Sequence, residues 1–327
     1  TNSAQFQGAN RSMSIAPPES IEIIDGHYFI PERAGAYLVH DSEEAAFVDN
    51  ITRFSISHLL ETLEKQGLKP EQVRYAIVTH VHLDHSGGTA ELIKHCPNAT
   101  VLCHPKAGPH IIDPSKLVAG ARSIYDNFDQ LYGEIEPVDA DRVRIMEDLE
   151  SVQLGSRTLT FYDTPGHARH HHAILDSQTN TMIAGDAFGL RYHQLQGGTS
   201  QYMTYVCAPP TFEPDKGRAS VRKILDANPD HIGVTHYGMV GDIQQGAEQV
   251  LRSIDKFEEV SKRASETDLE GDALQDYCTQ GCLDVIKEEL NISGLDTNDD
   301  EVMRWGTHEH AVTSQGVAVL AQRLRKA

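Results

Sequence analysis

The sequence predicts a mixed α/β body followed by an all-helical C-terminal appendage. Short apolar runs typical of β-strands recur between residues 20 and 235, separated by Gly, Pro and charged residues, with helical spacing between several of them. Beyond residue 241 only helical spacing remains. We therefore expect an α/β body over residues 14–240 and a helical appendage over 241–327. Residues 1–13 are polar and without pattern, and we expect them to be a disordered tail.

The first half of the body predicts strands that lead into helices. Leu59, Leu60 and Leu63 have helical spacing and Gly67 closes that segment. Tyr75–Thr79 is a continuous apolar run, which is typical of a strand buried on both faces. The remaining predicted elements are strand regions at Ser20–Pro31, Ala36–Val48 and Thr100–Cys103, and a helix at Thr89–His95.

The second half of the body returns to strands after a helix-and-loop region at residues 104–140. Five short strand patterns lie between Val143 and Asp186. Pro214–Ala227 predicts a helix and His231–Thr235 a last buried strand. The appendage then predicts a helix through Ile243 and Phe257, a second through Leu274 and Ile286, and a third within Val302–Leu324.

Composition excludes several classes of protein. Asp and Glu total 48 against 28 Lys and Arg, for a formal net charge of -20, which argues against nucleic acid as a partner. No apolar run approaches the roughly 20 residues that cross a bilayer, so we expect no membrane partner. Five Cys are too few for a disulfide scaffold, and we expect a cytoplasmic protein. The count of 18 His directs attention to metal binding.

The segment His80-Val81-His82-Leu83-Asp84-His85 follows a buried strand and precedes a helix. Residues two apart in extended backbone project to the same side, so His80 and His82 can reach one ion. The chain then turns, which places Asp84 and His85 beside a second position. Leaving such side chains buried and unpaired would cost several kcal/mol, about 2–7 for a polar group. The segment therefore predicts a metal site.

Three later residues repeat the same pattern of a ligand-type side chain at the end of a strand. They are His167 in Thr164–His167, Asp186 after an apolar strand, and His236 after another. Nitrogen and carboxylate donors without a thiolate suit zinc, iron or manganese. Capping or core hydrogen bonding is the alternative for each of the three taken alone.

These motifs, in this order, resemble the metallo-β-lactamase-fold hydrolases, over roughly residues 20–240, and in particular their glyoxalase II-like and lactonase-like branch. The resemblance implies an αββα sandwich with two divalent metals, zinc foremost and iron or manganese as alternatives, and a metal-bound hydroxide as nucleophile. It implies that Asp186 bridges the metals and that Asp84 also orients the hydroxide and passes a proton to the leaving group. The ligand sets that it implies are His80, His82 and His167 for the first metal and Asp84, His85 and His236 for the second.

Departures from the sequence patterns of particular family members narrow the range of activities that the resemblance implies. Asp186 stands where true β-lactamases typically carry Cys or Ser, and His82 stands where flavin-linked di-iron oxygen reductases carry Glu. Glyoxalase II-like thioesterases often read TPGHTxGH; here His171 matches the second His, while Ala168 and His170 depart. The resemblance thus favours a hydrolase other than a β-lactamase and leaves glutathione thioesters in doubt.

The aromatic segment 187–217 follows Asp186 directly. It is either a pocket wall beside the metals or packing for the helical appendage. On the first alternative, the candidate substrate-binding residues are Phe188, Tyr192, His193 and Tyr202. Asp49 and His171 are candidates for supporting the metal ligands, each with an ordinary structural alternative.

Two further pairs mimic metal ligands without the same context. Cys278 and Cys282 are one helical turn apart, and we interpret them as buried packing. His308 and His310 begin no strand, and we interpret them as surface residues.

The leading hypothesis is a dinuclear metal hydrolase that cleaves an ester, thioester or lactone of a small, moderately apolar molecule. The appendage would close over the aromatic segment or mediate a homodimer. A mononuclear non-haem iron oxygenase or sulfur dioxygenase on the same fold is the second hypothesis. A non-catalytic sensor that retains the metals is the third.

Overall fold

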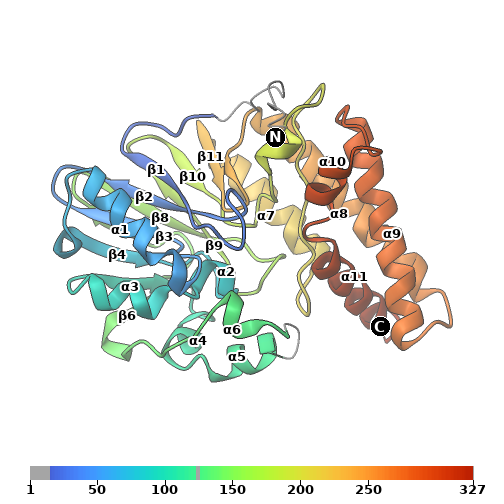
Figure 1. The fold of residues 1–327 in the computed structure, drawn as a ribbon, viewed down its shortest axis with the longest axis horizontal. Helices are drawn as coiled ribbons and strands as arrows, with labels where there is room; N and C mark the ends of the chain where they lie inside the picture. The colour runs from blue at the N-terminus through green and yellow to red at the C-terminus, as the bar shows by residue number, and fades with distance from the viewer. Residues whose placement is uncertain (1–14, 123–125, 327) are drawn as a thin grey trace, which may run out of the picture.

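Two six-stranded sheets face each other and helices cover both outer faces, which makes an αββα sandwich (Figure 1). The computed structural model describes residues 15–122 and 126–326. The predicted tail at residues 1–13 lies outside that range. The predicted fold class is confirmed.

The first sheet has the strands in chain order, β1-β2-β3-β4-β5-β6. The first three strands pair antiparallel, and β3 to β6 pair parallel. Its strands are β1 (Ile21–Asp25), β2 (Gly35–His40), β3 (Ala45–Val48), β4 (Val73–Ile77), β5 (Thr100–Cys103) and β6 (Val143–Ile145). Helices α1 (Ile56–Lys65) and α3 (Thr89–His95) contact this sheet.

The second sheet has the order β12-β11-β10-β9-β8-β7. Strands β7 to β10 pair antiparallel, β10 and β11 pair parallel, and β12 returns antiparallel. Its strands are β7 (Ser151–Leu154), β8 (Arg157–Asp163), β9 (His172–Asp176), β10 (Thr181–Ile183), β11 (His231–Val234) and β12 (Gly238–Met239). Because β8, β10 and β11 run in the same direction, their carboxyl ends reach the same edge of the sheet.

Three apolar clusters correspond to the three interfaces between layers. Val39, Ile77 and Phe161 belong to the cluster between the two sheets. A second cluster joins the outer face of the first sheet to its helices. The third joins the outer face of the second sheet to helix α7 (Pro214–Asp226) and to the C-terminal helices.

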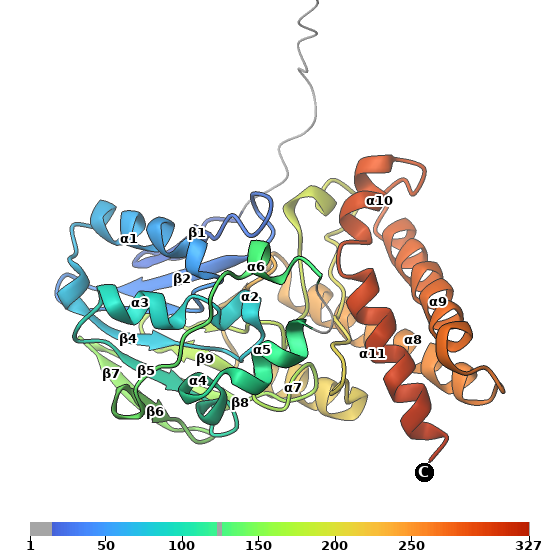
Figure 2. The ribbon, with the colours of Figure 1, turned by 60° about the horizontal axis from the view of Figure 1, so that its bottom comes forward.

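The C-terminal helices lie together at one end of the sandwich, beyond α7 (Figure 2). Their bounds are α8 (Ile243–Ser265), α9 (Gly271–Ile292), α10 (Asp300–Gly306) and α11 (His310–Leu324). The Asp242 carboxylate caps α8 by accepting from the Gln245 amide at 3.0 Å. Val250, Ile254 and Phe257 belong to the same cluster as Met182 of the second sheet. Whether residues 241–327 form a domain of their own stays a prediction.

The described helices include none with both the length and the apolar character needed to cross a membrane.

Residues 104–140 contain short helices and loops, as predicted. The helices of this region are α4 (Gly108–Ile112), α5 (Ser115–Arg122) and α6 (Phe128–Leu131). The other short helices are α2 (Leu83–Ser86) and four 3-10 turns at Arg53–Ser55, Pro70–Gln72, Ala140–Arg142 and His193–Leu195.

The predicted strand region Ser20–Pro31 is wrong in its second half. Strand β1 ends at Asp25, and His27, Phe29 and Glu32 have positive φ of 48°, 65° and 60°. The Asp25 carboxylate accepts from the amides of His27 at 2.9 Å and Glu32 at 3.0 Å, and this stabilises a turn instead of a strand. The two-residue strand β12 was not predicted.

Candidate metal centre

The predicted ligand residues converge at one edge of the sandwich, from segments that follow buried strands. His80 and His82 follow β4, and His82 precedes the short helix α2 that carries Asp84 and His85. The other three follow strands β8, β10 and β11, whose carboxyl ends share an edge; they are His167, Asp186 and His236. All seven side chains fall into three overlapping groups whose donor atoms lie within 4.8 Å of one another.

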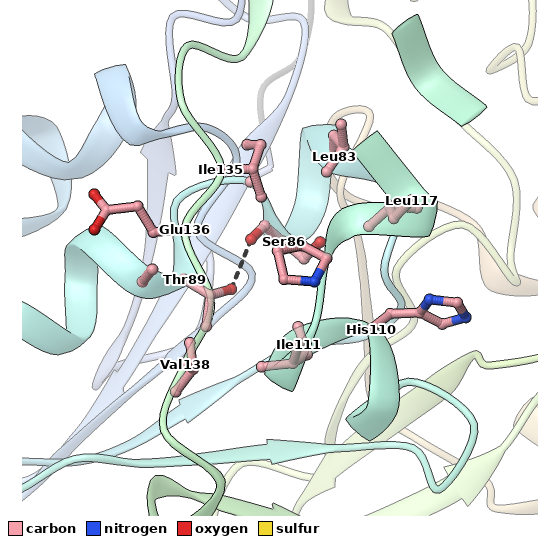
Figure 3. Close-up of a pocket in the computed structure, with 12 residues that line it drawn as sticks. Leu83, Ser86, Thr89, His110, Ile111, Leu117, Ile135, Glu136 and Val138 are labelled. Atoms are coloured by element: carbon pink, nitrogen blue, oxygen red, sulfur yellow. Dashed lines mark hydrogen bonds between the residues drawn. The ribbon is translucent and has the colours of Figure 1, made fainter. Parts of the chain in front are cut away.

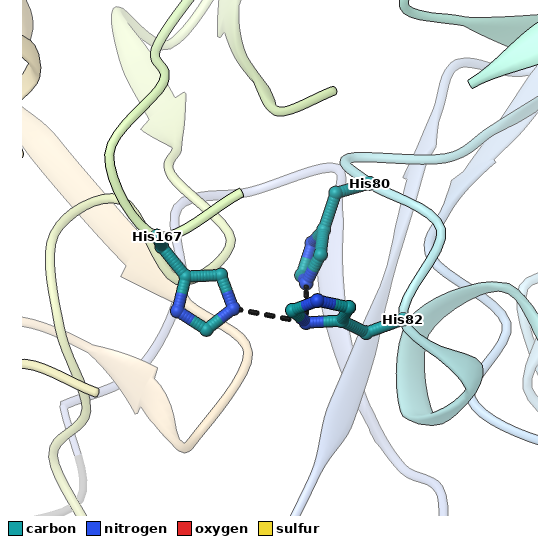
Figure 4. A group of neighbouring side chains, drawn as sticks. All are labelled: His80, His82 and His167. Atoms are coloured by element: carbon teal, nitrogen blue, oxygen red, sulfur yellow. Dashed lines mark hydrogen bonds between the residues drawn. The ribbon is translucent and has the colours of Figure 1, made fainter. Parts of the chain in front are cut away.

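The first donor group consists of His80, His82 and His167 (Figure 4). His82 Nδ1 lies 2.9 Å from His80 Nε2 and 3.0 Å from His167 Nε2. His167 Nδ1 donates to the Val206 carbonyl at 3.0 Å, so in the neutral ring Nε2 is unprotonated and its lone pair can bind a cation. Burial lowers the pKa of each of the three imidazoles, so they are neutral at pH 7, the form that binds metals.

The second donor group consists of Asp84, His85 and His236. Asp84 Oδ2 lies 3.5 Å from His236 Nε2, and Asp84 Oδ1 lies 4.0 Å from His85 Nε2. His236 Nδ1 donates to the Arg33 carbonyl at 2.7 Å, and His85 Nδ1 lies 2.7 Å from Asp49 Oδ2. In both histidines the Nε2 atom therefore faces the group.

Carboxylates set the protonation of the second group. Burial opposes charge on His85, yet Asp186, Asp49 and Asp84 hold its pKa well above the usual value. Burial likewise opposes charge on His236, but Asp186 and Asp84 raise its pKa to about 9. Burial disfavours ionised Asp84, and the neighbouring His85 and His236 nevertheless lower its pKa.

Asp186 lies between the two groups. Its Oδ2 atom is 3.4 Å from both His85 Nε2 and His167 Nε2, and its Oδ1 atom is 3.8 Å from His236 Nε2. Burial opposes ionisation of this carboxyl, but the histidines, His85 foremost, lower its pKa. One carboxylate thus borders donors of both groups.

The donors fit a divalent cation. Among the described residues, His85 Nε2 and Asp186 Oδ1 are buried atoms without a hydrogen-bond partner. Such atoms are costly unless something satisfies them, and a cation between them would do so. Imidazole and carboxylate donors suit zinc, iron or manganese.

Asp49 and His171 contact the donor residues. The Asp49 carboxylate accepts from the Thr79 amide at 2.8 Å and the Thr235 hydroxyl at 3.1 Å, in addition to its contact with His85. His171 Nε2 accepts from the Asp186 amide at 3.1 Å, and its Nδ1 lies 2.8 Å from the Thr164 hydroxyl. Both residues are therefore in place to orient donor residues.

The next histidine points elsewhere. The ring of His172 lies 4.7 Å from that of His104, whose Nε2 is 3.1 Å from Asp163 Oδ1. Neighbouring residues on a strand face opposite sides, and His171 and His172 follow this rule.

The structure separates the four candidate substrate-binding residues. Phe188, Tyr192 and Tyr202 are all buried in the cluster shared with the C-terminal helices. His193 is buried, and its ring lies 4.6 Å from that of Tyr237. Tyr192 is the one beside the donors, with its ring 6.2 Å from that of His236. Its hydroxyl donates to Glu309 Oε1 at 2.9 Å.

The interpretation of His308 and His310 as surface residues is wrong. The His308 ring stacks on Trp305 at 5.0 Å and lies 5.8 Å from Tyr192. His310 Nε2 donates to the Thr279 carbonyl at 2.7 Å. Tertiary packing of the helices half-buries both side chains. By contrast, Cys278 and Cys282 are buried in the core, as predicted.

Sequence reasoning missed Arg33 and Glu309, which border the second group. They form an ion pair at 3.1 Å, although 276 residues separate them in the chain. No local pattern marks so distant a pair. The His-Glu-His segment was a visible signal, but only the fold shows where its central residue points.

Two small cavities flank the centre. One lies behind α2 and is lined by Leu83, Ile111 and Leu117 among others (Figure 3). The other lies between Tyr192 and the C-terminal helices. Each has a volume of about 10 Å³, near the roughly 10–15 Å³ that one water needs. The Asp84 side chain is 24% exposed, so the centre opens to solvent there.

Residues 36–236 match the family model of the metallo-beta-lactamase superfamily, and the chain belongs to that superfamily. The match begins in the second strand and ends at His236. It therefore includes every residue of the two donor groups and Asp186.

Several curated proteins are similar over about half of this chain. The metallo-beta-lactamase fold-containing protein ST1585 of Sulfurisphaera tokodaii is 26% identical over 174 residues, which are 52% of this chain and 62% of that protein. The acyl-coenzyme A thioesterase MBLAC2 of Homo sapiens is 27% identical over 195 residues, 50% of this chain and 63% of that protein. The matched segments thus span less than two thirds of these two relatives.

Other relatives differ in the activity that their names give. An N-acyl homoserine lactonase of Azorhizobium caulinodans is 31% identical over 33% of this chain and 38% of its own length. A nitric oxide reductase of Moorella thermoacetica is 30% identical over 47% of this chain and 33% of its own length.

Solved structures share the fold. The structure of ST1585 from Sulfolobus tokodaii has a TM-score of 0.61 at 23% identity and covers 85% of this chain and 100% of that one. The family protein TTHA1429 from Thermus thermophilus has a TM-score of 0.64 at 16% identity and covers 93% and 94%.

Proposed function

We propose that the protein is a dinuclear metal-dependent hydrolase that cleaves an ester, thioester or lactone of a small, moderately apolar molecule. His80, His82 and His167 would hold one divalent ion, and Asp84, His85 and His236 the other. Asp186 would bridge them. Zinc is our first choice, with iron or manganese as alternatives.

The position of Asp186 carries this proposal. Its carboxylate lies within 3.8 Å of nitrogens from both donor groups, an arrangement that a single-metal site does not need. A thioesterase and a lactonase among the relatives support carbonyl chemistry for a centre of this kind.

Bound divalent ions would raise the acidity of a water and polarise the substrate carbonyl. The residues of this chain contribute orientation and proton handling. Asp84 is ionised and is the partly exposed carboxylate of the second group, so it can accept a hydrogen bond from an attacking water. It can then hold that proton on an oxygen and deliver it to the leaving group. Tyr192 packs beside His236 and shapes that side of the centre.

Charge and space favour a small neutral substrate. The net charge of -20 disfavours polyanions such as nucleic acid. The flanking cavities are about 10 Å³ each, so we propose that substrate binds over the exposed side of Asp84 and not in the aromatic segment. A cytoplasmic location and a homodimer stay predictions.

An oxygenase or a sulfur dioxygenase with one iron is the second candidate. The oxidoreductase names among the relatives favour it. Against it, a mononuclear site would leave Asp84 and His236 without a function at the centre.

Metal analysis joined to a substrate screen tests the proposal. Protein purified without added metal should contain two divalent ions per chain and should turn over one class among esters, thioesters and lactones. One iron per chain, with oxygen uptake and no hydrolysis, would establish the second candidate. Two metals with no turnover of any substrate class would point to the sensor.

A further inference from the structure

Glu309 joins the C-terminal helices to two segments of the α/β body. It directly precedes α11, and its side chain is 17% exposed. Its Oε1 atom accepts from the Tyr192 hydroxyl at 2.9 Å and from Arg33 Nη2 at 3.1 Å. One carboxylate oxygen therefore holds the loop between β1 and β2 and the segment that follows β10.

Arg33 and Tyr192, one residue from each of these segments, both lie beside His236. The Arg33 carbonyl accepts from His236 Nδ1 at 2.7 Å, which fixes the ring so that Nε2 faces Asp84 and Asp186. The Tyr192 ring lies 6.2 Å from the ring of His236. The residues that orient His236 are thus the ones that Glu309 holds.

The charges make this link sensitive to Glu309. Arg33 is largely buried, and its guanidinium lies 4.8 Å from the Tyr28 ring centre and 5.4 Å from that of Phe29. Taking its carboxylate partner away would leave a poorly solvated cation, which would move toward water. Because the carbonyl that orients His236 belongs to the same residue, such a movement would reach the donor atom.

We propose that Glu309 is a positioning residue for the second donor group. Through Arg33 and Tyr192 it holds the His236 ring in the orientation in which Nε2 faces Asp84 and Asp186. The metal affinity of this group then depends on a residue of the C-terminal helices. The inference rests on the proposed dinuclear centre. The first group is anchored elsewhere, by Val206 and beside Thr79, and is independent of Glu309.

The test is a metal titration that resolves two equivalents. Metal-free wild type, Glu309→Gln and the control Glu288→Gln are titrated with Zn²⁺ against a chromophoric chelator, and with Co²⁺ for its visible spectrum. Glu288 is a matched control because its carboxylate also forms an ion pair, with Lys256 at 2.8 Å. It differs from Glu309 in being 59% exposed and in lying on α9, away from His236. Glu309→Gln should weaken the second equivalent about tenfold, the lower end of the effect of an outer partner of a ligand. The first equivalent and the control should match wild type.

Tyr192→Phe removes a single hydroxyl and serves if Glu309→Gln fails to fold. It should weaken the same equivalent by a smaller factor, with a changed Co²⁺ spectrum for that equivalent alone. Equal loss of both equivalents would show a general structural role and overturn the inference, as would no change in either. Wild type that binds no second equivalent would overturn the dinuclear proposal as well, so the two failures are distinguishable.

Discussion

The two donor groups share one edge of the sandwich but differ in what surrounds them. His80 and His167 are anchored through Nδ1 by the neutral Thr79 hydroxyl and Val206 carbonyl. Burial, and after it the neighbouring histidines, lower the pKa values of all three imidazoles of the first group. Asp186, Asp49 and Asp84 raise the pKa of His85 against the effect of its burial. Asp186 and Asp84 likewise raise the pKa of His236, to about 9. A metal entering the first group thus meets neutral imidazoles, whereas one entering the second must displace protons. The carboxylates therefore have two effects on the second group. They are candidate ligands, and they also favour the protonated form of its histidines.

Asp186→Asn should have the largest effect, because this carboxylate borders both groups. Metal content should fall below two per chain, and turnover should fall by more than the roughly 10–100-fold that the loss of an outer partner costs. Elemental analysis and steady-state rates on the same preparation measure both. Asp226→Asn, an exposed aspartate at the end of α7, is the control. An Asn variant with full metal and normal turnover would end the bridging assignment.

Single histidine variants should separate the groups. His167→Ala should remove the first equivalent and His236→Ala the second, since each takes one nitrogen from one group only. Metal titration of the metal-free proteins shows which equivalent is lost. His231 is an exposed histidine at the start of β11, and His231→Ala is the control for general effects of removing a histidine. If both variants lost the same equivalent, the division into two groups would be wrong.

Asp49→Asn should weaken the second equivalent by about 10–100-fold while the first changes less. The substitution keeps the size of the side chain but removes the charge that faces His85 Nδ1 at 2.7 Å. Calorimetric or chelator-competition titration measures the ratio of the two affinities. An unchanged ratio would mean that Asp49 only supports the fold around Thr79.

The pH dependence of binding should differ between the groups. A histidine with a raised pKa is protonated below that pKa and competes with metal, so the second equivalent should bind more tightly as pH rises from 6 toward about 9. The expected slope is about tenfold per pH unit for each proton displaced. The first equivalent should be nearly independent of pH over this range. Parallel slopes for both equivalents would contradict the comparison.

The sequence was enough to select the seven side chains that converge at one edge of the sandwich, because each follows an apolar strand and strand ends can be recognised from local pattern. His80 to His85 lie within six residues, and His167, Asp186 and His236 each stand alone at the end of an apolar run. The same runs predicted a mixed α/β body, whereas the αββα arrangement was predicted from the resemblance to the metallo-β-lactamase-fold hydrolases. The strands and the residues at their ends can be predicted because they depend on short-range periodicity, which is visible in the sequence itself.

What was missed depends on contacts between distant segments. The turn that begins at His27 was predicted as strand as far as Pro31 because these residues have strand propensity. In the structure, hydrogen bonds to the Asp25 carboxylate and positive φ at His27, Phe29 and Glu32 form a turn instead. The pairing of Arg33 with Glu309 could not be predicted from local pattern because 276 residues separate them, although the His-Glu-His segment around Glu309 was visible in the sequence. Phe188, Tyr192 and Tyr202 are aromatic residues of one segment and all three are buried in one core cluster, and only the fold shows that Tyr192 is the one of them whose ring lies beside His236.

The number of divalent ions bound per chain tests the central claim most directly. Metal-free protein should take up two equivalents of Zn²⁺ at pH 8, and Asp186→Asn should take up fewer. Uptake of a single equivalent by wild type, unchanged by Asp186→Asn, would contradict the dinuclear centre.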